Sequence, residues 1–120
     1  MGKRVMVVDD SMVMRVMLKQ LLTKNGYEVV AEAVNGADAV AKYPLSKPDL
    51  VTMDITMPDM DGITAVKEII KLDPNAKIIM CSAMGTMDKV KAAILAGAKN
   101  FLVKPLQPEK VLTTVQLVLG

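Results

Sequence analysis

Five residues able to take part in chemistry come directly after short apolar runs, at points where buried strands would give way to loops. They are three carboxylates, a hydroxyl and an ammonium: Asp9, Asp10, Asp54, Ser82 and Lys104. In an open parallel sheet, ligands collect beyond the carboxyl ends of the strands, at the point where the strand order reverses. We therefore expect these five side chains to share one pocket.

The three carboxylates of such a pocket would repel one another. Two carboxylates about 5 Å apart repel by about 3 kcal/mol at an effective dielectric constant of 20, so the cluster is costly unless a cation is present. Taken singly, each Asp could equally cap a helix or form a turn. The chain has no His, the commonest transition-metal ligand. Mg²⁺ suits the site because it prefers oxygen, retains waters and needs only one or two carboxylates.

Phosphoryl transfer is a reaction that would use all five groups. A carboxylate can attack a phosphoryl group and form an aspartyl phosphate. A metal and an ammonium neutralise the phosphoryl oxygens, and a hydroxyl donates one hydrogen bond. Asp54 is the predicted nucleophile because it stands alone at the end of its strand. Asp9 and Asp10 are better placed to hold the metal, directly or through water.

Regular alternation of apolar runs and amphipathic segments must position these groups. Strands are expected at 3–8, 28–33, 49–53, 77–81 and 98–103, and helices at 12–25, from 35–36 to about 45, through 63–70, at 87–96 and from 108 onward. A loop containing Gly85 should precede the fourth helix. Five strands alternating with five helices through short connections predict an α/β fold, a parallel sheet covered by helices on both faces.

The first predicted helix illustrates the signals. Its apolar residues fall at i, i+3, i+4, i+7 and i+8, which makes one stripe: Met14, Met17, Leu18, Leu21 and Leu22. Ser11 is a good N-cap, and Gly26 can end the helix in a left-handed conformation.

Composition bounds the setting of the protein. At 120 residues, the chain is expected to be a single domain, 1–120, and a monomer. No apolar run is long enough to cross a membrane, and no leader is recognisable. A single cysteine, Cys81, cannot form an internal disulfide, which favours a cytoplasmic location. A net charge of +2 with scattered basic residues argues against nucleic acid as a partner.

Four segments together resemble the receiver domain of two-component response regulators, in particular the stand-alone chemotaxis regulators: VMVVDDSMVMR, DLVTMDITMPDMDG, IIMCSA and FLVKP. The resemblance covers the whole chain. It implies a flavodoxin-like (βα)5 fold, a doubly wound parallel five-stranded sheet with strand order 2-1-3-4-5. It also implies that Asp54 accepts a phosphoryl group from a histidine kinase. Mg²⁺ would be held by Asp10, Asp54 and the backbone carbonyl of Thr56, with Asp9 reaching it through water.

The same resemblance implies a switch. Ser82 would be the switch hydroxyl, Lys104 the phosphate partner and Phe101 the switch aromatic, where many relatives have Thr and Tyr in place of Ser82 and Phe101. We expect Phe101 to be mobile or outward without phosphate and inward with it. Because burying a phenyl ring needs no hydrogen bond, the inward state could already be well populated without phosphate. Relatives have a cis peptide before the proline, so Lys104–Pro105 is expected to be cis.

The predicted output is phosphorylation-dependent binding to a motor-switch or motor-adaptor protein, and a phosphatase could act as a further partner. The chain would therefore be a switch and not an enzyme that turns over a metabolite. A phosphorelay intermediate or adaptor in a non-chemotaxis two-component pathway remains open. A haloacid-dehalogenase-type phosphatase would need a second Asp where Thr56 stands. A flavodoxin-type electron carrier is disfavoured because there is no Trp, and no Ser/Thr-rich loop follows the first strand.

Overall fold

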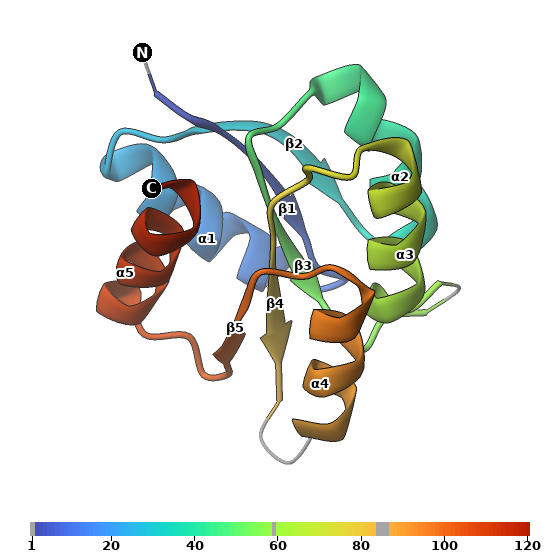
Figure 1. Ribbon diagram of the computed structural model, residues 1–120. Helices are drawn as coiled ribbons and strands as arrows, with labels where there is room; N and C mark the ends of the chain where they lie inside the picture. The colour runs from blue at the N-terminus through green and yellow to red at the C-terminus, as the bar shows by residue number, and fades with distance from the viewer. Residues whose placement is uncertain (1, 59, 84–86) are drawn as a thin grey trace.

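The computed structural model describes residues 2–58, 60–83 and 87–120, so the predicted loop position Gly85 lies outside the described residues. Strands and helices alternate along the chain (Figure 1). The strands are β1 (Arg4–Val8), β2 (Glu28–Ala33), β3 (Leu50–Asp54), β4 (Ile78–Ser82) and β5 (Asn100–Val103). The helices are α1 (Met12–Lys24), α2 (Gly36–Ser46), α3 (Gly62–Leu72), α4 (Met87–Ala96) and α5 (Pro108–Leu119).

The five strands form one parallel sheet in the order β2-β1-β3-β4-β5, which confirms the predicted flavodoxin-like topology. Helices α1 and α5 cover one face, and α2, α3 and α4 cover the other (Figure 1). The chain order reverses between β1 and β3, the position at which such sheets bind ligands.

Strand β1 shows why the central strands are apolar throughout. Val5 and Val7 pack with the residues of α1 and α5, whereas Met6 and Val8 pack with those of α2, α3 and α4. Successive side chains of a strand point to opposite faces, so a sheet buried on both faces needs apolar residues at every position. The two resulting cores hold the strand ends in fixed register.

Helix α1 begins at the predicted Met12 and ends at Lys24, one residue before the predicted end. The Ser11 hydroxyl caps the helix by accepting a hydrogen bond from the Met14 amide at 3.3 Å. Gly26 follows the C-cap with a φ of 89°, a conformation that side-chain-bearing residues rarely adopt. Within the predicted apolar stripe, Leu18 and Leu22 are buried, but Met17 is 40% exposed because it lies on the edge of the stripe, away from the sheet.

Several strand boundaries lie one or two residues from their predicted positions. Asp54 is the last residue of β3 instead of the first residue after it. Strand β5 starts at Asn100 and not at Ala98, because the Ala98 amide donates to the Ala93 carbonyl and so completes the end of α4.

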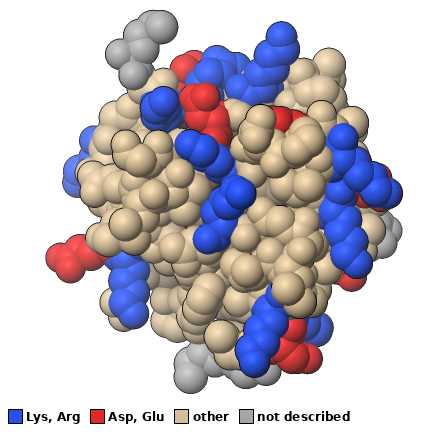
Figure 2. All heavy atoms as spheres, in the orientation of Figure 1, with Lys and Arg blue, Asp and Glu red and all other residues tan. Residues whose placement is uncertain are grey.

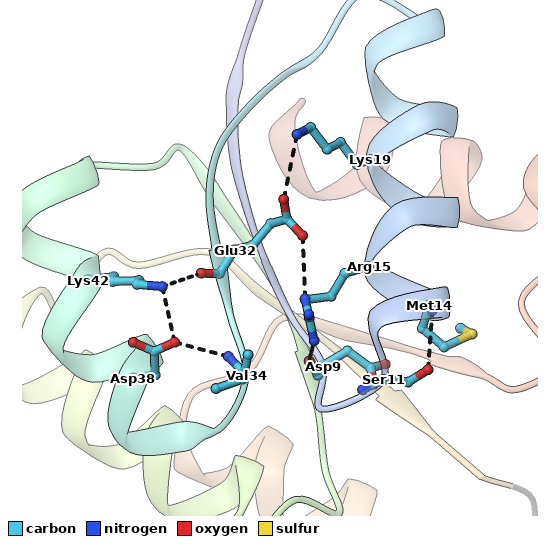
Figure 3. A network of polar contacts seen from close by, with 9 residues as sticks. All are labelled: Asp9, Ser11, Met14, Arg15, Lys19, Glu32, Val34, Asp38 and Lys42. Carbon is cyan, nitrogen blue, oxygen red and sulfur yellow. Dashed lines mark hydrogen bonds and ion pairs between the residues drawn. The ribbon is translucent and has the colours of Figure 1, made fainter.

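At the carboxyl end of β2, side chains of α2 close the free edge of the sheet. The Ala33 carbonyl points inward and accepts from the Asp9 amide, so the groups one residue on either side point outward. Lys42 Nζ donates to the Glu32 carbonyl at 2.6 Å, and Asp38 Oδ2 accepts from the Val34 amide at 3.1 Å. The two side chains also pair with each other at 3.1 Å (Figure 3).

Charged side chains are distributed over the surface. On the face shown in Figure 2, lysines and arginines stand in several separate places among uncharged residues. No helix in the described ranges combines the length and apolar character needed to cross a bilayer.

Candidate functional site

The predicted chemical residues come from the carboxyl ends of four strands. Asp9 follows β1, Asp54 ends β3, Ser82 ends β4 and Lys104 follows β5. The strand register brings these ends to one edge of the sheet, since Asp54 is level with Cys81 and Ser82 with Val103.

Three carboxylates converge at this edge. One carboxylate oxygen each of Asp9, Asp10 and Asp54 lie within 4.8 Å of one another. Asp9 and Asp54 are buried, whereas Asp10 is exposed at the mouth of the cluster. Lys104 Nζ lies 3.2 Å from Asp9 Oδ2 and 3.3 Å from Asp54 Oδ1. The structure thus brings the three predicted carboxylates together and places Lys104 in contact with two of them.

The electrostatics of the cluster are dominated by burial. Burial, followed by the negative charge of Asp9, raises the pKa of Asp54 to about 6, even though the Lys104 ammonium partly offsets both. Burial alone would lower the pKa of Lys104, but the charges of Asp54 and Asp9 outweigh it and leave that pKa above its usual value. At neutral pH, Asp54 is therefore ionised, yet more basic than an ordinary aspartate.

Each polar atom of Asp9 has a defined partner. Oδ1 accepts from the Ser11 amide at 2.9 Å, Oδ2 accepts from Lys104, and the amide donates to the Ala33 carbonyl. The Asp9 carbonyl accepts from Arg15 Nη1 at 2.8 Å (Figure 3). The turn that carries Asp9 and Asp10 is consequently held by β2, α1 and β5 together.

The loop after β3 is closed by a hydrogen bond from the Gly62 amide to the Ile55 carbonyl at 2.8 Å. Gly62 approaches the backbone so closely that a Cβ there would overlap the Asp54 carbonyl. Thr56, the predicted carbonyl ligand, is exposed in this loop two residues after Asp54. Asp61 caps α3 by accepting from the Thr64 amide.

The predicted switch residues lie on neighbouring strands. Ser82 is buried, and its hydroxyl has no hydrogen-bond partner among the described residues. Phe101 is half-buried, packs against the core on the α4 side of the sheet and borders a cavity of about 410 Å³ between β5 and α5. The Lys104–Pro105 peptide is cis, as predicted.

Cys81, next to Ser82, is 3% exposed, and burial raises the pKa of its thiol to about 12. It therefore stays protonated and serves as core packing.

Arg15 and Glu32 were not among the residues selected from the sequence. Arg15 Nε lies 3.4 Å from Glu32 Oε1, and the same arginine contacts Asp9 (Figure 3). The sequence does contain one indication that Arg15 could reach Asp9. Helical side chains lean toward the N-terminus of the helix, and Arg15 lies in the first turns of the helix that follows Asp9. Nothing in the local sequence signals Glu32, which comes from a separate strand.

The donor set fits a hard divalent cation. Carboxylate oxygens at this spacing, with one carboxylate exposed to water, match the oxygen ligands and retained waters that Mg²⁺ prefers. One ammonium against three carboxylates leaves net negative charge for a cation to neutralise.

The chain matches the response regulator receiver domain family over residues 5–116. It is 62% identical over 118 residues to the chemotaxis protein CheY of Thermotoga maritima, covering 98% of both chains. It is also 60% identical over 120 residues to the chemotaxis protein CheY of Bacillus subtilis, covering 100% of both chains.

Solved structures agree with this similarity. The fold superposes with a TM-score of 0.94 on a chain of the CheX-CheY-BeF3-Mg²⁺ complex from Borrelia burgdorferi, which is 43% identical, over 98% of this chain and 90% of that one. The likeness thus extends over the whole receiver fold, including the edge of the sheet where the acidic residues meet.

Proposed function

This chain belongs to the response regulator receiver domain family, and we propose that it is a chemotaxis switch that accepts a phosphoryl group on Asp54. The observation that carries the proposal is a buried aspartate at the end of the central strand, beside two more carboxylates and an ammonium. The full-length identity to CheY proteins favours chemotaxis over a phosphorelay role. The protein is a phosphorylation-dependent switch and not an enzyme acting on a metabolite.

In the proposed reaction, a carboxylate oxygen of Asp54 attacks the phosphorus of a phosphohistidine on a histidine kinase. The P–N bond breaks as the P–O bond forms, and the imidazole leaves with the electron pair. The raised pKa of Asp54 makes its carboxylate a better nucleophile than an ordinary aspartate once it is ionised. The Lys104 ammonium, already 3.3 Å from Asp54 Oδ1, can follow the new phosphoryl oxygens.

Asp9, Asp10, Asp54 and the Thr56 carbonyl are the proposed holders of Mg²⁺. When bound, the metal would neutralise the carboxylates and the phosphoryl oxygens. Asp9 is oriented for this by the Ser11 amide and by Lys104. The Ser82 hydroxyl has no partner within the described part of the chain, which supports its role as the donor that turns toward the phosphoryl group, because a buried hydroxyl gains a hydrogen bond by doing so.

Movement of Ser82 would leave space beside β4 into which Phe101 could turn. The surface altered by this movement would be the face formed by α4, β5 and α5, where Leu95 is 89% exposed. We propose that a motor-switch or motor-adaptor protein reads this face in the cytoplasm. A phosphatase is also a proposed partner, since the Borrelia burgdorferi relative was solved in complex with CheX.

Acetyl phosphate and Mg²⁺ provide a direct test. Mass spectrometry of the intact protein should detect one added phosphoryl group, which should be lost in Asp54→Asn and retained in Asp88→Asn, a carboxylate of α4 outside the pocket. Undiminished incorporation in Asp54→Asn would mean that another residue is the nucleophile. A pull-down with and without BeF3⁻, which mimics a phosphoryl group on a carboxylate, would then identify the output partner.

A further inference from the structure

We propose that Arg15 is a positioning residue for the metal site, holding the Asp9–Asp10 turn in place while anchored by Glu32. The proposal rests on the magnesium site of the proposed function. It concerns a residue that would touch neither the metal nor the phosphoryl group.

The first step is the peptide that joins Asp9 to Asp10. Arg15 Nη1 donates to the Asp9 carbonyl at 2.8 Å. A peptide unit is planar, so fixing the direction of its carbonyl also fixes the direction in which the chain continues to Asp10. Asp10 is exposed and has little packing of its own to hold it. Its position relative to Asp9 and Asp54 therefore depends on this hydrogen bond.

The second step is the anchor of the arginine. Arg15 Nε lies 3.4 Å from Glu32 Oε1, and only 13% of the Arg15 side chain is exposed. Glu32 is itself fixed, because its Oε2 lies 3.6 Å from Lys19 Nζ and its backbone carbonyl accepts from Lys42 (Figure 3). A planar guanidinium can meet the carboxylate and the carbonyl through different nitrogens at once, which an ammonium cannot do with the same geometry.

The third step separates positioning from charge. Arg15 is cationic, and a cation near the acidic cluster repels Mg²⁺. If Arg15 acted only through its charge, its removal would tighten magnesium binding. If it acts by holding the turn, its removal weakens binding, because groups that orient metal ligands control metal affinity. The two explanations predict opposite signs.

Lys19 supplies a matched control. It lies one helical turn beyond Arg15 on α1 and pairs with the same Glu32, but it has no contact with Asp9 in Figure 3. Lys19→Met removes one positive charge and one Glu32 partner, as Arg15→Met does, and leaves the Asp9 carbonyl bonded to Arg15.

The experiment is calorimetric titration of the metal-free protein with MgCl2, with urea unfolding in EDTA run on every variant. Arg15→Met should weaken Mg²⁺ binding about threefold to tenfold. Removing a group that orients a metal ligand typically weakens metal binding by about tenfold or more, so the expected effect is at or below the low end of that range. Lys19→Met should leave the Kd unchanged or slightly lower. Arg15→Lys keeps the positive charge and should also weaken Mg²⁺ binding. This variant tests the proposal even if Arg15→Met does not fold.

An unchanged or tighter Kd in Arg15→Met would overturn the positioning role, and so would equal weakening in Lys19→Met. The positioning role would likewise be overturned if Arg15→Lys bound Mg²⁺ with the same Kd as the unchanged protein. Absence of Mg²⁺ binding to the unchanged protein would instead overturn the proposed metal site, and this inference with it.

Discussion

Replacing Asp54 by Asn should stabilise the metal-free protein. Burial and the neighbouring Asp9 raise the pKa of Asp54 from 3.8 to about 6. A group with a raised folded-state pKa stabilises the fold below its unfolded pKa and loses that contribution as the pH rises through the folded pKa. Above about pH 7, the ionised Asp54 should therefore cost the fold about 3 kcal/mol, at about 1.4 kcal/mol per tenfold change in proton affinity.

Asn keeps the shape of the side chain without the charge, and Lys104 keeps its contact with Asp9. In EDTA at about pH 7.5, Asp54→Asn should thus unfold at higher urea, by about 2–3 kcal/mol, and the gain should fall toward zero at about pH 4. Saturating Mg²⁺ should reduce the difference, because it neutralises the charge that Asn removes. Circular dichroism can follow unfolding, and Asp88→Asn serves as the remote control.

Equal or lower stability of Asp54→Asn at neutral pH in EDTA would refute the reasoning. It would mean that Lys104 compensates the buried charge fully and that the cluster is not strained. A gain that persists undiminished to about pH 4 would also count against it, because the cause would then be packing and not charge.

Two further predictions concern the same edge of the sheet. Mg²⁺ at ten times its Kd should stabilise the protein by about 1.4 kcal/mol over EDTA, and Asp10→Ala should abolish most of that difference; equal melting midpoints for the unchanged protein in saturating Mg²⁺ and in EDTA would contradict the metal site. Gly62→Ala should destabilise the protein by at least about 2 kcal/mol and slow phosphorylation, because its Cβ would displace the backbone of Asp54 and Ile55. If the melting midpoint and the phosphorylation time course of this variant matched those of the unchanged protein, the loop would be able to shift and accommodate the Cβ.

The order and type of the helices and strands could be predicted because the local signals agree. Apolar runs with carboxylates, a hydroxyl and a lysine at their ends predicted the convergence of Asp9, Asp54 and Lys104, since parallel strands have one common carboxyl edge. The boundaries were less predictable. Whether Ala98 belongs to β5 or to the end of α4 depends on which carbonyl accepts its amide hydrogen, and the sequence does not specify that.

The supporting contacts of the site could not be predicted for a different reason. Arg15 and Glu32 are far apart along the chain, and their pairing depends on how α1 lies across β2. Local patterns describe one element at a time and carry no information about such a crossing. The lack of a partner for the Ser82 hydroxyl among the described residues is of the same kind, because it depends on which groups of neighbouring strands and helices lie near it.

The closed edge of β2 has a consequence for how the protein can associate. An incoming strand would need the Glu32 carbonyl and the Val34 amide, and the side chains of Lys42 and Asp38 already occupy both. Strand addition, the route by which exposed sheet edges aggregate or recruit extended peptides, is thus blocked beside the acidic pocket. Partners are then expected to bind other surfaces of the protein, including the face formed by α4, β5 and α5.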